Sequence, residues 1–282
     1  AMNVHMFENP RTQRNIEVLK GDGYHFIEPG DGYLACGYVA KGRMEEPLQI
    51  VSVMNQFFNN DAVSTDSSFS GKRALVTAGP TVEVIDPVRY VTNRSSGKMG
   101  FAIAEALREK GAEVTLVTGP TQLTDPKGIN VIHVQSAEDM FNAVKERYNA
   151  QDIIFKAAAV SDYTPSEVLD HKMKKREGDL SVTFKRTTDI LKYLGDNKKH
   201  QYLVGFAAET QNIEAYAQDK LARKNADVII SNNVGDQSIG FSSDDNELTM
   251  HFKNKDMVNI KKGKKVELAK QILDELETRW QQ

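Results

Sequence analysis

Continuous apolar runs alternate with amphipathic segments along most of the chain. The apolar runs cover residues 74–79, 113–118, 152–160, 202–208 and 227–231. Amphipathic, helix-like segments lie between and after them, near residues 98–110, 138–148, 212–225 and 265–280. Strands that are apolar throughout are typical of sheets covered on both faces, so the alternation predicts an α/β fold with a mostly parallel sheet flanked by helices.

Two further patterns complete the expected organisation. The segments ELTMHF and DMVNIK are separated by the turn-like residues 253–255 and predict a β-hairpin added to the sheet. The polar, Ser-rich stretch NNDAVSTDSSFS lacks periodicity and follows the helix-like run PLQIVSVMNQFF. We therefore expect an N-terminal segment over residues 1–58, a linker over 59–70 and a larger domain over 71–282.

Composition excludes several classes of protein. The chain has 282 residues, of which 40% are hydrophobic and 27% charged, with a formal net charge of -3. This balance is typical of soluble globular proteins and offers nucleic acid no general attraction. With one cysteine and no apolar run of about 18 residues, we expect a cytoplasmic protein that binds neither membranes nor nucleic acid. The six histidines and the cysteine lack metal-ligand spacing, so no protein side chain is expected to bind a metal.

The segment ALVTAGPTVEVIDPVRYVTNRSSGKMGFAIA, residues 74–104, reads as a strand, a long polar loop and a helix. Such a loop leaves the carboxyl end of a parallel strand, where ligands bind, and the amides at the start of the next helix attract phosphate. The sequence predicts a nucleotide or phosphate site here. It is not a P-loop, because Thr92 and Met99 replace the required Gly and Ser or Thr, and no GxGxxG follows the strand.

Several motifs occur together between residues 72 and 280: GPTVEVIDPVRYVTNRSSGKMG, KAAAVSDYTP, KMKK, GFAAET and GFSSDDNEL. Taken together they resemble phosphopantothenoylcysteine synthetase of the coenzyme A pathway. Upstream, AMNVHM and LACGYVAKGRMEEP resemble the final third of phosphopantothenoylcysteine decarboxylase, a flavoprotein often fused ahead of the synthetase in bacteria. The resemblance implies a Rossmann-like sheet preceded by a partial flavoprotein segment, in a truncated bifunctional protein. FMN would bind only to a complete decarboxylase domain, so no decarboxylase activity is expected.

The resemblance also implies a reaction. The carboxylate of 4'-phosphopantothenate would attack the α-phosphate of CTP, with Mg²⁺ arriving on the nucleotide, to give an acyl-cytidylate and pyrophosphate. The amine of L-cysteine would then displace CMP. Apart from the resemblance, the sequence does not show whether the nucleotide is CTP or ATP. The family further implies a homodimer through the synthetase domain and a larger homo-oligomer for the full-length fusion.

Two residues match catalytic positions of the family. Asn93, in VTNRSSGKMG, would hold the acyl-cytidylate, since an amide donates to a phosphoryl or carbonyl oxygen without adding charge; a turn residue is the alternative. Lys172 heads KMKK and would neutralise charge from a mobile loop that closes over the intermediate, whereas a charge run by itself is usually a solvated face.

The remaining positions carried over contact ligands. Hydroxyls and amides of the loop would bind phosphate or substrate, although helix capping explains the same residues: Ser95, Ser96, Gly97 and Lys98. The nucleotide would contact Ala158, Asp162, Asp189, Ile190, Phe206, Lys220 and Lys224. Each has an ordinary alternative: Ala158 and Phe206 would be core residues, and Asp162 would form an Asx turn or a helix cap. Lys220 and Lys224 would complement a helix dipole. Thr188 stands where the family usually has Pro, which affects the shape of the loop at Asp189.

In the N-terminal segment, Asn3 matches a decarboxylase residue that contacts the substrate carboxylate, and Cys36 matches the proton donor on a flexible flap. A lone cysteine is otherwise a small buried residue. Ala40 replaces a usual Gly of that flap. Two other functions stay open for the whole chain: a nucleotide-binding module without catalysis, retained as a scaffold, and an NAD(P)-dependent reductase.

Overall fold

The computed structural model describes residues 2–33, 39–60, 67–174, 180–209, 213–233 and 245–280. The chain divides into two compact units, residues 1–62 and residues 63–282, called here the N-terminal unit and the C-terminal unit.

The N-terminal unit combines three helices with a two-stranded antiparallel sheet. Its elements are α1 (Val4–Phe7), α2 (Pro10–Gly21), β1 (Gly30–Tyr33), β2 (Val39–Arg43) and α3 (Pro47–Asn60). Helix α2 begins at a proline, and the side chain of Asn9 caps it by accepting from the Arg11 N–H. Helix α3 extends through Asn60, so the first residues of the expected linker are helical.

The C-terminal unit is built on an eight-stranded sheet of order β14-β13-β12-β11-β8-β3-β6-β7. The strands are β3 (Arg73–Ala78), β6 (Glu113–Thr118), β7 (Asn130–His133), β8 (Ile153–Lys156), β11 (Tyr202–Glu209), β12 (Val228–Asn233), β13 (Asp245–Phe252) and β14 (Met257–Lys264). All neighbours from β12 to β7 pair in parallel. The hairpin β13–β14 adds antiparallel strands at one edge, as expected from ELTMHF and DMVNIK.

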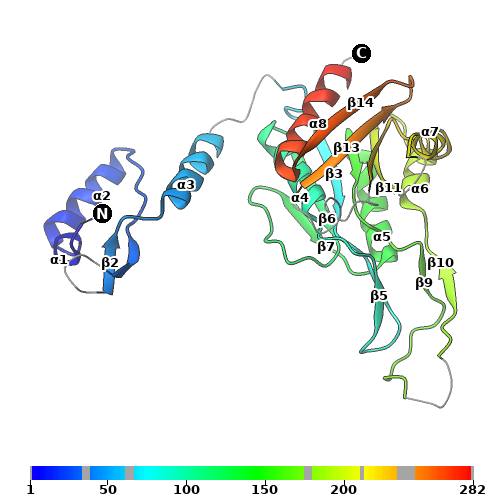
Figure 1. The fold of residues 1–282 in the computed structure, drawn as a ribbon, viewed down its shortest axis with the longest axis horizontal. Helices are drawn as coiled ribbons and strands as arrows, with labels where there is room; N and C mark the ends of the chain where they lie inside the picture. Colours follow the sequence, from blue (N-terminus) through cyan, green and yellow to red (C-terminus); the bar gives the residue numbers. More distant parts are fainter. Residues whose placement is uncertain are drawn as a thin grey trace. The chain divides into compact units, whose positions relative to one another are not determined.

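Helices cover both faces of this sheet (Figure 1). On one face lie α4 (Lys98–Glu109) and α8 (Lys265–Trp280), and on the other α5 (Ala137–Arg147), the 3₁₀ turn η1 (Tyr148–Ala150), α6 (Ile190–Asn197) and α7 (Ile213–Lys224). Successive strand residues point to opposite faces, so Val76 and Phe155 pack toward α4 and α8, whereas Leu75 and Ile154 pack toward α5 and α6. This double burial explains why the strands are apolar throughout.

Two short antiparallel pairs extend away from the main sheet (Figure 1). They are β4 (Val82–Val84) with β5 (Tyr90–Thr92), and β9 (Tyr163–Pro165) with β10 (Phe184–Arg186). Residues 82–92, 163–174 and 180–186 are called the arm below. The Leu169 N–H donates to the Ile85 carbonyl at 3.0 Å and joins the halves of the arm.

The expected fold class is confirmed. One predicted strand is shorter than expected, because the apolar run 152–160 is a strand only from Ile153 to Lys156. Beyond it the chain turns toward the loop after β3, where the Ala159 N–H donates to the Gly79 carbonyl at 2.9 Å. At the other end of the expected linker, Phe69 is fully buried and its ring centroid lies 5.1 Å from that of Trp280. In the described part of the chain, no helix is both long and apolar enough to cross a membrane.

Candidate active site

A cleft lies at the carboxyl ends of β3 and β8, where the topology of the sheet reverses direction. From β3 the chain continues to β6 on one side, and from β8 it continues to β11 on the other. Loops that diverge in this way leave a crevice, the usual ligand site of open α/β sheets. One cavity of about 460 Å³ opens here, and a second of about 340 Å³ adjoins it. Both are lined by Lys156, Val160, Asp162, Phe206 and Lys220.

The N-terminus of α4 forms one wall of the first cavity, which Ser95, Ser96, Gly97 and Lys98 all line. Gly97 precedes the helix with φ at 77° and gives it no side-chain cap. A Cβ there would lie 2.8 Å from the Thr121 methyl group, so the position requires glycine. Because the first amides of a helix lack intrahelical partners, this wall offers N–H donors to an anion.

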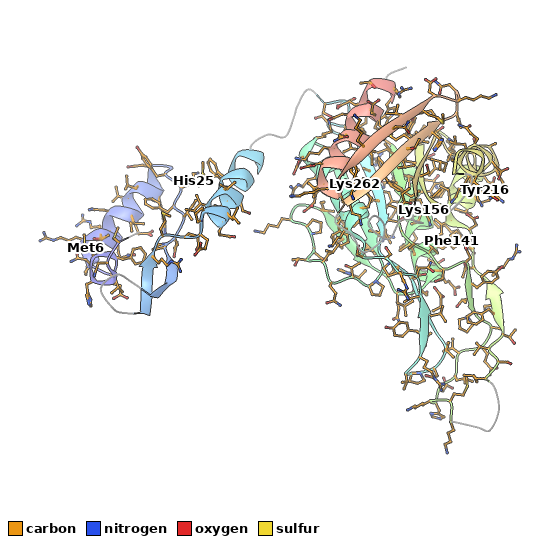
Figure 2. All side chains as sticks on the ribbon, in the orientation of Figure 1. Met6, His25, Phe141, Lys156, Tyr216 and Lys262 are labelled. Carbon is orange, nitrogen blue, oxygen red and sulfur yellow. The ribbon has the colours of Figure 1, made fainter. Side chains whose placement is uncertain are left out.

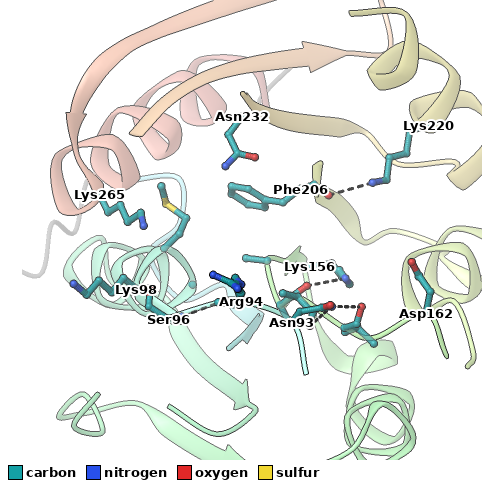
Figure 3. Close-up of a pocket in the computed structure, with 18 residues that line it drawn as sticks. Asn93, Arg94, Ser96, Lys98, Lys156, Asp162, Phe206, Lys220, Asn232 and Lys265 are labelled. Carbon is teal, nitrogen blue, oxygen red and sulfur yellow. Dashed lines mark hydrogen bonds between the residues drawn. The ribbon is translucent and has the colours of Figure 1, made fainter. Parts of the chain in front are cut away.

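Asn93 joins the two loops that frame the cleft. Its Nδ2 donates to the Ala159 carbonyl at 3.1 Å and to the Val160 carbonyl at 3.2 Å. Both amide N–H groups are therefore used within the protein, whereas the family resemblance implies that they donate to a ligand. The oxygen Oδ1 remains as the acceptor that Asn93 can present to the first cavity, which its side chain lines (Figure 3).

The segment after β8 supplies the floor of the cleft. The Ala158 N–H donates to Thr77 Oγ1 at 3.2 Å, which ties the ends of β8 and β3 together. Asp162 is exposed, and its main-chain carbonyl accepts from the Thr187 N–H at 3.0 Å. Phe206 of β11 lies across the cleft from this floor (Figure 3). A planar ring and an exposed carboxylate suit a nucleoside, since they can contact a base and accept from ribose hydroxyls.

The second cavity lies between α6 and α7 and brings together Asp189, Ile190, Lys220 and Lys224. Asp189 caps α6 by accepting from the Lys192 N–H at 2.9 Å and also pairs with Lys224. Burial alone would raise the pKa of Asp189, but hydrogen bonds from Lys224 and the Lys192 amide outweigh it and lower that pKa. Asp189 therefore caps α6, as the alternative interpretation of this residue expects, and it also lines the second cavity. Lys220 donates to the Phe206 carbonyl at 3.4 Å.

Lys156 is a cleft residue that the sequence analysis missed. It ends β8 and donates to the Ala158 carbonyl at 2.8 Å. Burial and the nearby Lys220 ammonium lower the pKa of Lys156 to about 8. The signal in the sequence is a lysine at the centre of the apolar run 152–160, where it begins the motif KAAAVSDYTP. Asn232 and the buried Lys265, also in the first cavity, carry no comparable local signal.

Lys172 lies outside both cavities, exposed on the arm. Its neighbour Met173 is anchored, because the Met173 N–H donates to Asp86 Oδ2 at 3.1 Å and Arg89 Nη2 donates to the Met173 carbonyl at 2.7 Å. The structure thus holds the Lys172 segment on the arm rather than over the cleft.

The two decarboxylase positions belong to the N-terminal unit. Asn3 caps α1, and its Oδ1 accepts from the His5 N–H at 2.9 Å. Cys36 lies outside the described residues. Within the described ranges, no three His, Cys, Asp or Glu side chains are grouped to hold a metal ion.

Comparison with known proteins identifies the family to which the chain belongs. Residues 69–279 match the family model of the DNA/pantothenate metabolism flavoprotein C-terminal domain, and residues 1–59 match the flavoprotein family model. The coenzyme A biosynthesis bifunctional protein CoaBC of Bacillus subtilis is 52% identical over 98% of this chain and 68% of its own length. That of Haemophilus influenzae is 43% identical over the whole chain and 69% of its own length.

Solved structures agree with the sequence matches. The crystal structure of the C-terminal domain of a coenzyme A biosynthesis bifunctional protein CoaBC has a TM-score of 0.65 and 44% identity. The match covers 75% of this chain and 98% of that domain. The chain belongs to the CoaBC family of coenzyme A biosynthesis bifunctional proteins, and its residues 69–279 form the family's C-terminal domain.

Proposed function

We propose that this chain is a cytoplasmic ligase that joins 4'-phosphopantothenate to L-cysteine at the expense of CTP. The carboxylate oxygen attacks the α-phosphorus of CTP, the bond to pyrophosphate breaks, and an acyl-cytidylate forms. The cysteine amine then attacks the acyl carbon, loses a proton, and CMP leaves. The names of the CoaBC relatives support a place in coenzyme A biosynthesis.

The observation that carries the proposal is the paired cavity at the topological switch point. Its volumes of about 460 and 340 Å³ are each within the range of small-molecule sites. The N-terminus of α4 lines the first cavity, and Lys220 and Lys224 line the second, so anionic groups meet donors at both ends. A reaction between two anionic substrates needs this distribution, because each must be neutralised where they meet.

Magnesium belongs to the proposal as a companion of CTP. Triphosphate oxygens and water supply most ligands of Mg²⁺ in such sites, so the cleft needs no dedicated cage of carboxylates. When bound, the ion neutralises charge on the phosphoryl oxygens. The exposed Asp162 and the N-terminus of α4 would then orient the nucleoside and the phosphate groups on either side of the reacting atoms.

The first half-reaction provides the test. The chain is incubated with 4'-phosphopantothenate, Mg²⁺ and either CTP or ATP, without cysteine, and pyrophosphate release is followed together with the mass of any acyl-nucleotide. Acyl-cytidylate formed with CTP alone is the expected result. CTP binding without product would support a non-catalytic module instead, and binding of NADPH in place of CTP would support a reductase.

We also propose that the C-terminal unit forms a homodimer through the arm. Exposed apolar side chains concentrate there: Val88, Tyr90, Val91, Tyr163, Val168, Leu180 and Phe184. Two-stranded sheets are marginally stable in water unless another surface covers them. A second copy of the chain supplies the same apolar surface by symmetry, as isologous dimers do.

A further inference from the structure

Lys156 occupies the point where the two cavities meet. It lines both of them, at the end of a strand that lies between β3 and β11 in the middle of the sheet. Figure 2 shows it within the body of the C-terminal unit, and Figure 3 shows it between Asn93 and Asp162, beneath Phe206. The resemblance on which the other site residues rest assigns this lysine no role.

The hydrogen bonding of Lys156 leaves donors for a ligand. An ammonium carries three N–H donors. Among the described residues, the Ala158 carbonyl accepts one of them at 2.8 Å. That bond directs the side chain back along the segment that forms the floor of the cleft, which holds Nζ where both cavities open. Even a partly buried ammonium is costly when its donors lack acceptors, so an acceptor that reaches Lys156 is favourable.

Charged groups from three directions face Lys156. Lys220 and Lys224 approach from α7, Asp162 from the segment after β8, and Asp189 from the start of α6. Lys224 is already paired with Asp189, so one negative charge in this group is neutralised within the protein. Among the described groups named here, three lysines face two aspartates, so positive charge is in excess at the junction. An anion fits that imbalance, and a neutral base or an amine does not.

We infer that Lys156 donates a hydrogen bond to a phosphate oxygen of the nucleotide at the junction of the two cavities. The inference rests on the proposed CTP-dependent function and extends it, because it assigns the phosphate chain to the junction. The base and ribose then extend from this point along Phe206 and Asp162, and Lys220 shares the phosphate charge.

A measurable consequence follows from the burial of Lys156. Because burial and Lys220 lower its pKa to about 8, a large fraction of the side chain is neutral at pH 8.5. A bound phosphate favours the charged form and raises that pKa, so nucleotide binding takes up a proton. The phosphate groups of CTP are fully ionised at this pH and contribute no uptake of their own.

The test is calorimetric binding of CTP with Mg²⁺ at pH 8.5 in two buffers of different ionisation enthalpy. The wild-type chain is expected to take up a fraction of a proton per CTP bound. Lys156→Met should weaken CTP binding about tenfold, the value of a hydrogen bond to a charged group, and abolish the uptake. Lys156→Arg stays charged at this pH and should keep affinity within about threefold while also abolishing the uptake. Lys261→Met, an exposed lysine of β14, is the matched control and should change neither quantity.

The outcomes separate this inference from the proposed function. If the wild-type chain forms acyl-cytidylate while Lys156→Met keeps full affinity for CTP, the role of Lys156 is wrong and the ligase proposal stands. A loss of affinity confined to 4'-phosphopantothenate overturns the phosphate assignment in the same way. A wild-type chain that binds no CTP overturns both. Should Lys156→Met fold poorly, unchanged proton uptake in Lys156→Arg is enough to refute the inference.

Discussion

Asn93 joins two loops of the C-terminal unit and also lines the first cavity. Its amide donates to two successive carbonyls after β8, so the loop before α4 and the floor of the cleft keep a fixed separation. The residue also lines the first cavity, together with the N-terminus of α4. A substitution at this position therefore changes the shape of the site and its charge at once.

We expect Asn93→Asp to lower the rate of acyl-nucleotide formation by about a hundredfold, the usual effect of losing one stabilising group at a reacting centre. A carboxylate cannot donate to the Ala159 and Val160 carbonyls, and it places negative charge beside an anionic intermediate. Pyrophosphate release in the absence of cysteine measures the effect. Asn130→Asp, at an exposed strand end, is the control. A variant with full activity would remove Asn93 from the site.

Lys172 is the residue whose place in the structure differs most from its expected role. It is exposed on the arm, whereas the family role requires it at the intermediate. We expect Lys172→Gln to reduce turnover about a hundredfold while CTP affinity changes little, because the resemblance assigns the ammonium to charge neutralisation in the chemical step and not to holding CTP. Steady-state rates and CTP calorimetry separate the two quantities, with Lys185→Gln on β10 as control. Near-normal turnover would exclude Lys172 from the mechanism.

Single residues could be predicted from sequence where a motif surrounds them. Asn93, Asp162 and Phe206 lie in distinct motifs, and the fold brings them to one cleft. Lys156 begins KAAAVSDYTP, the motif that also contains Asp162, but the motif assigns the lysine no role; Lys265 reaches the same cleft from a helix start outside the quoted motifs. Their proximity is a property of the strand order, which a single sequence does not contain.

At the scale of elements, the buried carboxylate of Asp86 joins two segments of the arm, the loop between β4 and β5 and the segment around Met173. Burial alone would raise the pKa of Asp86, but hydrogen bonds from the amides of Met173, Val88 and Arg89 and from the Arg89 guanidinium lower it to about 2. A depressed carboxylate pKa stabilises the folded arm above pH 3.8, and this stabilisation is lost as the pH falls toward 2.

We therefore expect the segment around Met173 to lose hydrogen-exchange protection as the pH falls from about 4 to about 2. Asp86→Asn should lose the same protection already at pH 7, because a neutral amide accepts these hydrogen bonds more weakly. Exchange of this segment, corrected for the intrinsic rate, is the measurement. Asp170→Asn, exposed in the same segment, should leave it unchanged. Equal protection in Asp86→Asn and wild type would show that the Asp86 carboxylate does not hold the Met173 segment in place.

Helix α4 depends on a close approach to β3. A Cβ on Gly100 would lie 2.6 Å from that of Ala78, so Gly100→Ala forces the helix away from the sheet. Overpacking costs about 1–3 kcal/mol, against a gain of about 1 kcal/mol in helix propensity. We expect a net loss near 1 kcal/mol, a fall of about 2–4 °C in Tm and weaker CTP binding. Gly263→Ala has room for its Cβ and should change Tm little. An unchanged Tm for Gly100→Ala would show that α4 tolerates the methyl group.

Long elements could be predicted and short ones could not. The apolar runs at β3, β6, β11 and β12 and the amphipathic segments at α4, α5, α7 and α8 correspond closely to the expected ranges. The strands of the arm have three residues each, and those of β5 and β10 are exposed throughout. Strands of three residues are too short to show a period, and those with no buried residue leave no hydrophobic pattern in the sequence.

At the scale of the whole molecule, the C-terminal unit separates two tasks. The sheet and its covering helices form the cleft, and most of their apolar side chains are buried. The arm keeps several large apolar side chains exposed, including Tyr90 at 59% and Phe184 at 39%. Exposed apolar patches of this kind mark association surfaces. Because Lys172 also lies on the arm, association and the position of this lysine are expected to depend on each other.

We expect Tyr90→Asp to shift the protein from dimer to monomer, since a carboxylate placed in an apolar interface must lose its water. Sedimentation velocity over a range of concentrations measures the shift, and a dissociation constant at least about tenfold higher is expected. Met257→Asp, an exposed apolar residue of β14 away from the arm, should leave association unchanged. If Tyr90→Asp is monomeric and keeps its Tm and CTP affinity but loses turnover, dimerisation is required for the chemical step. A wild-type chain that sediments as a monomer at all concentrations would instead show that the arm is not the contact between two copies.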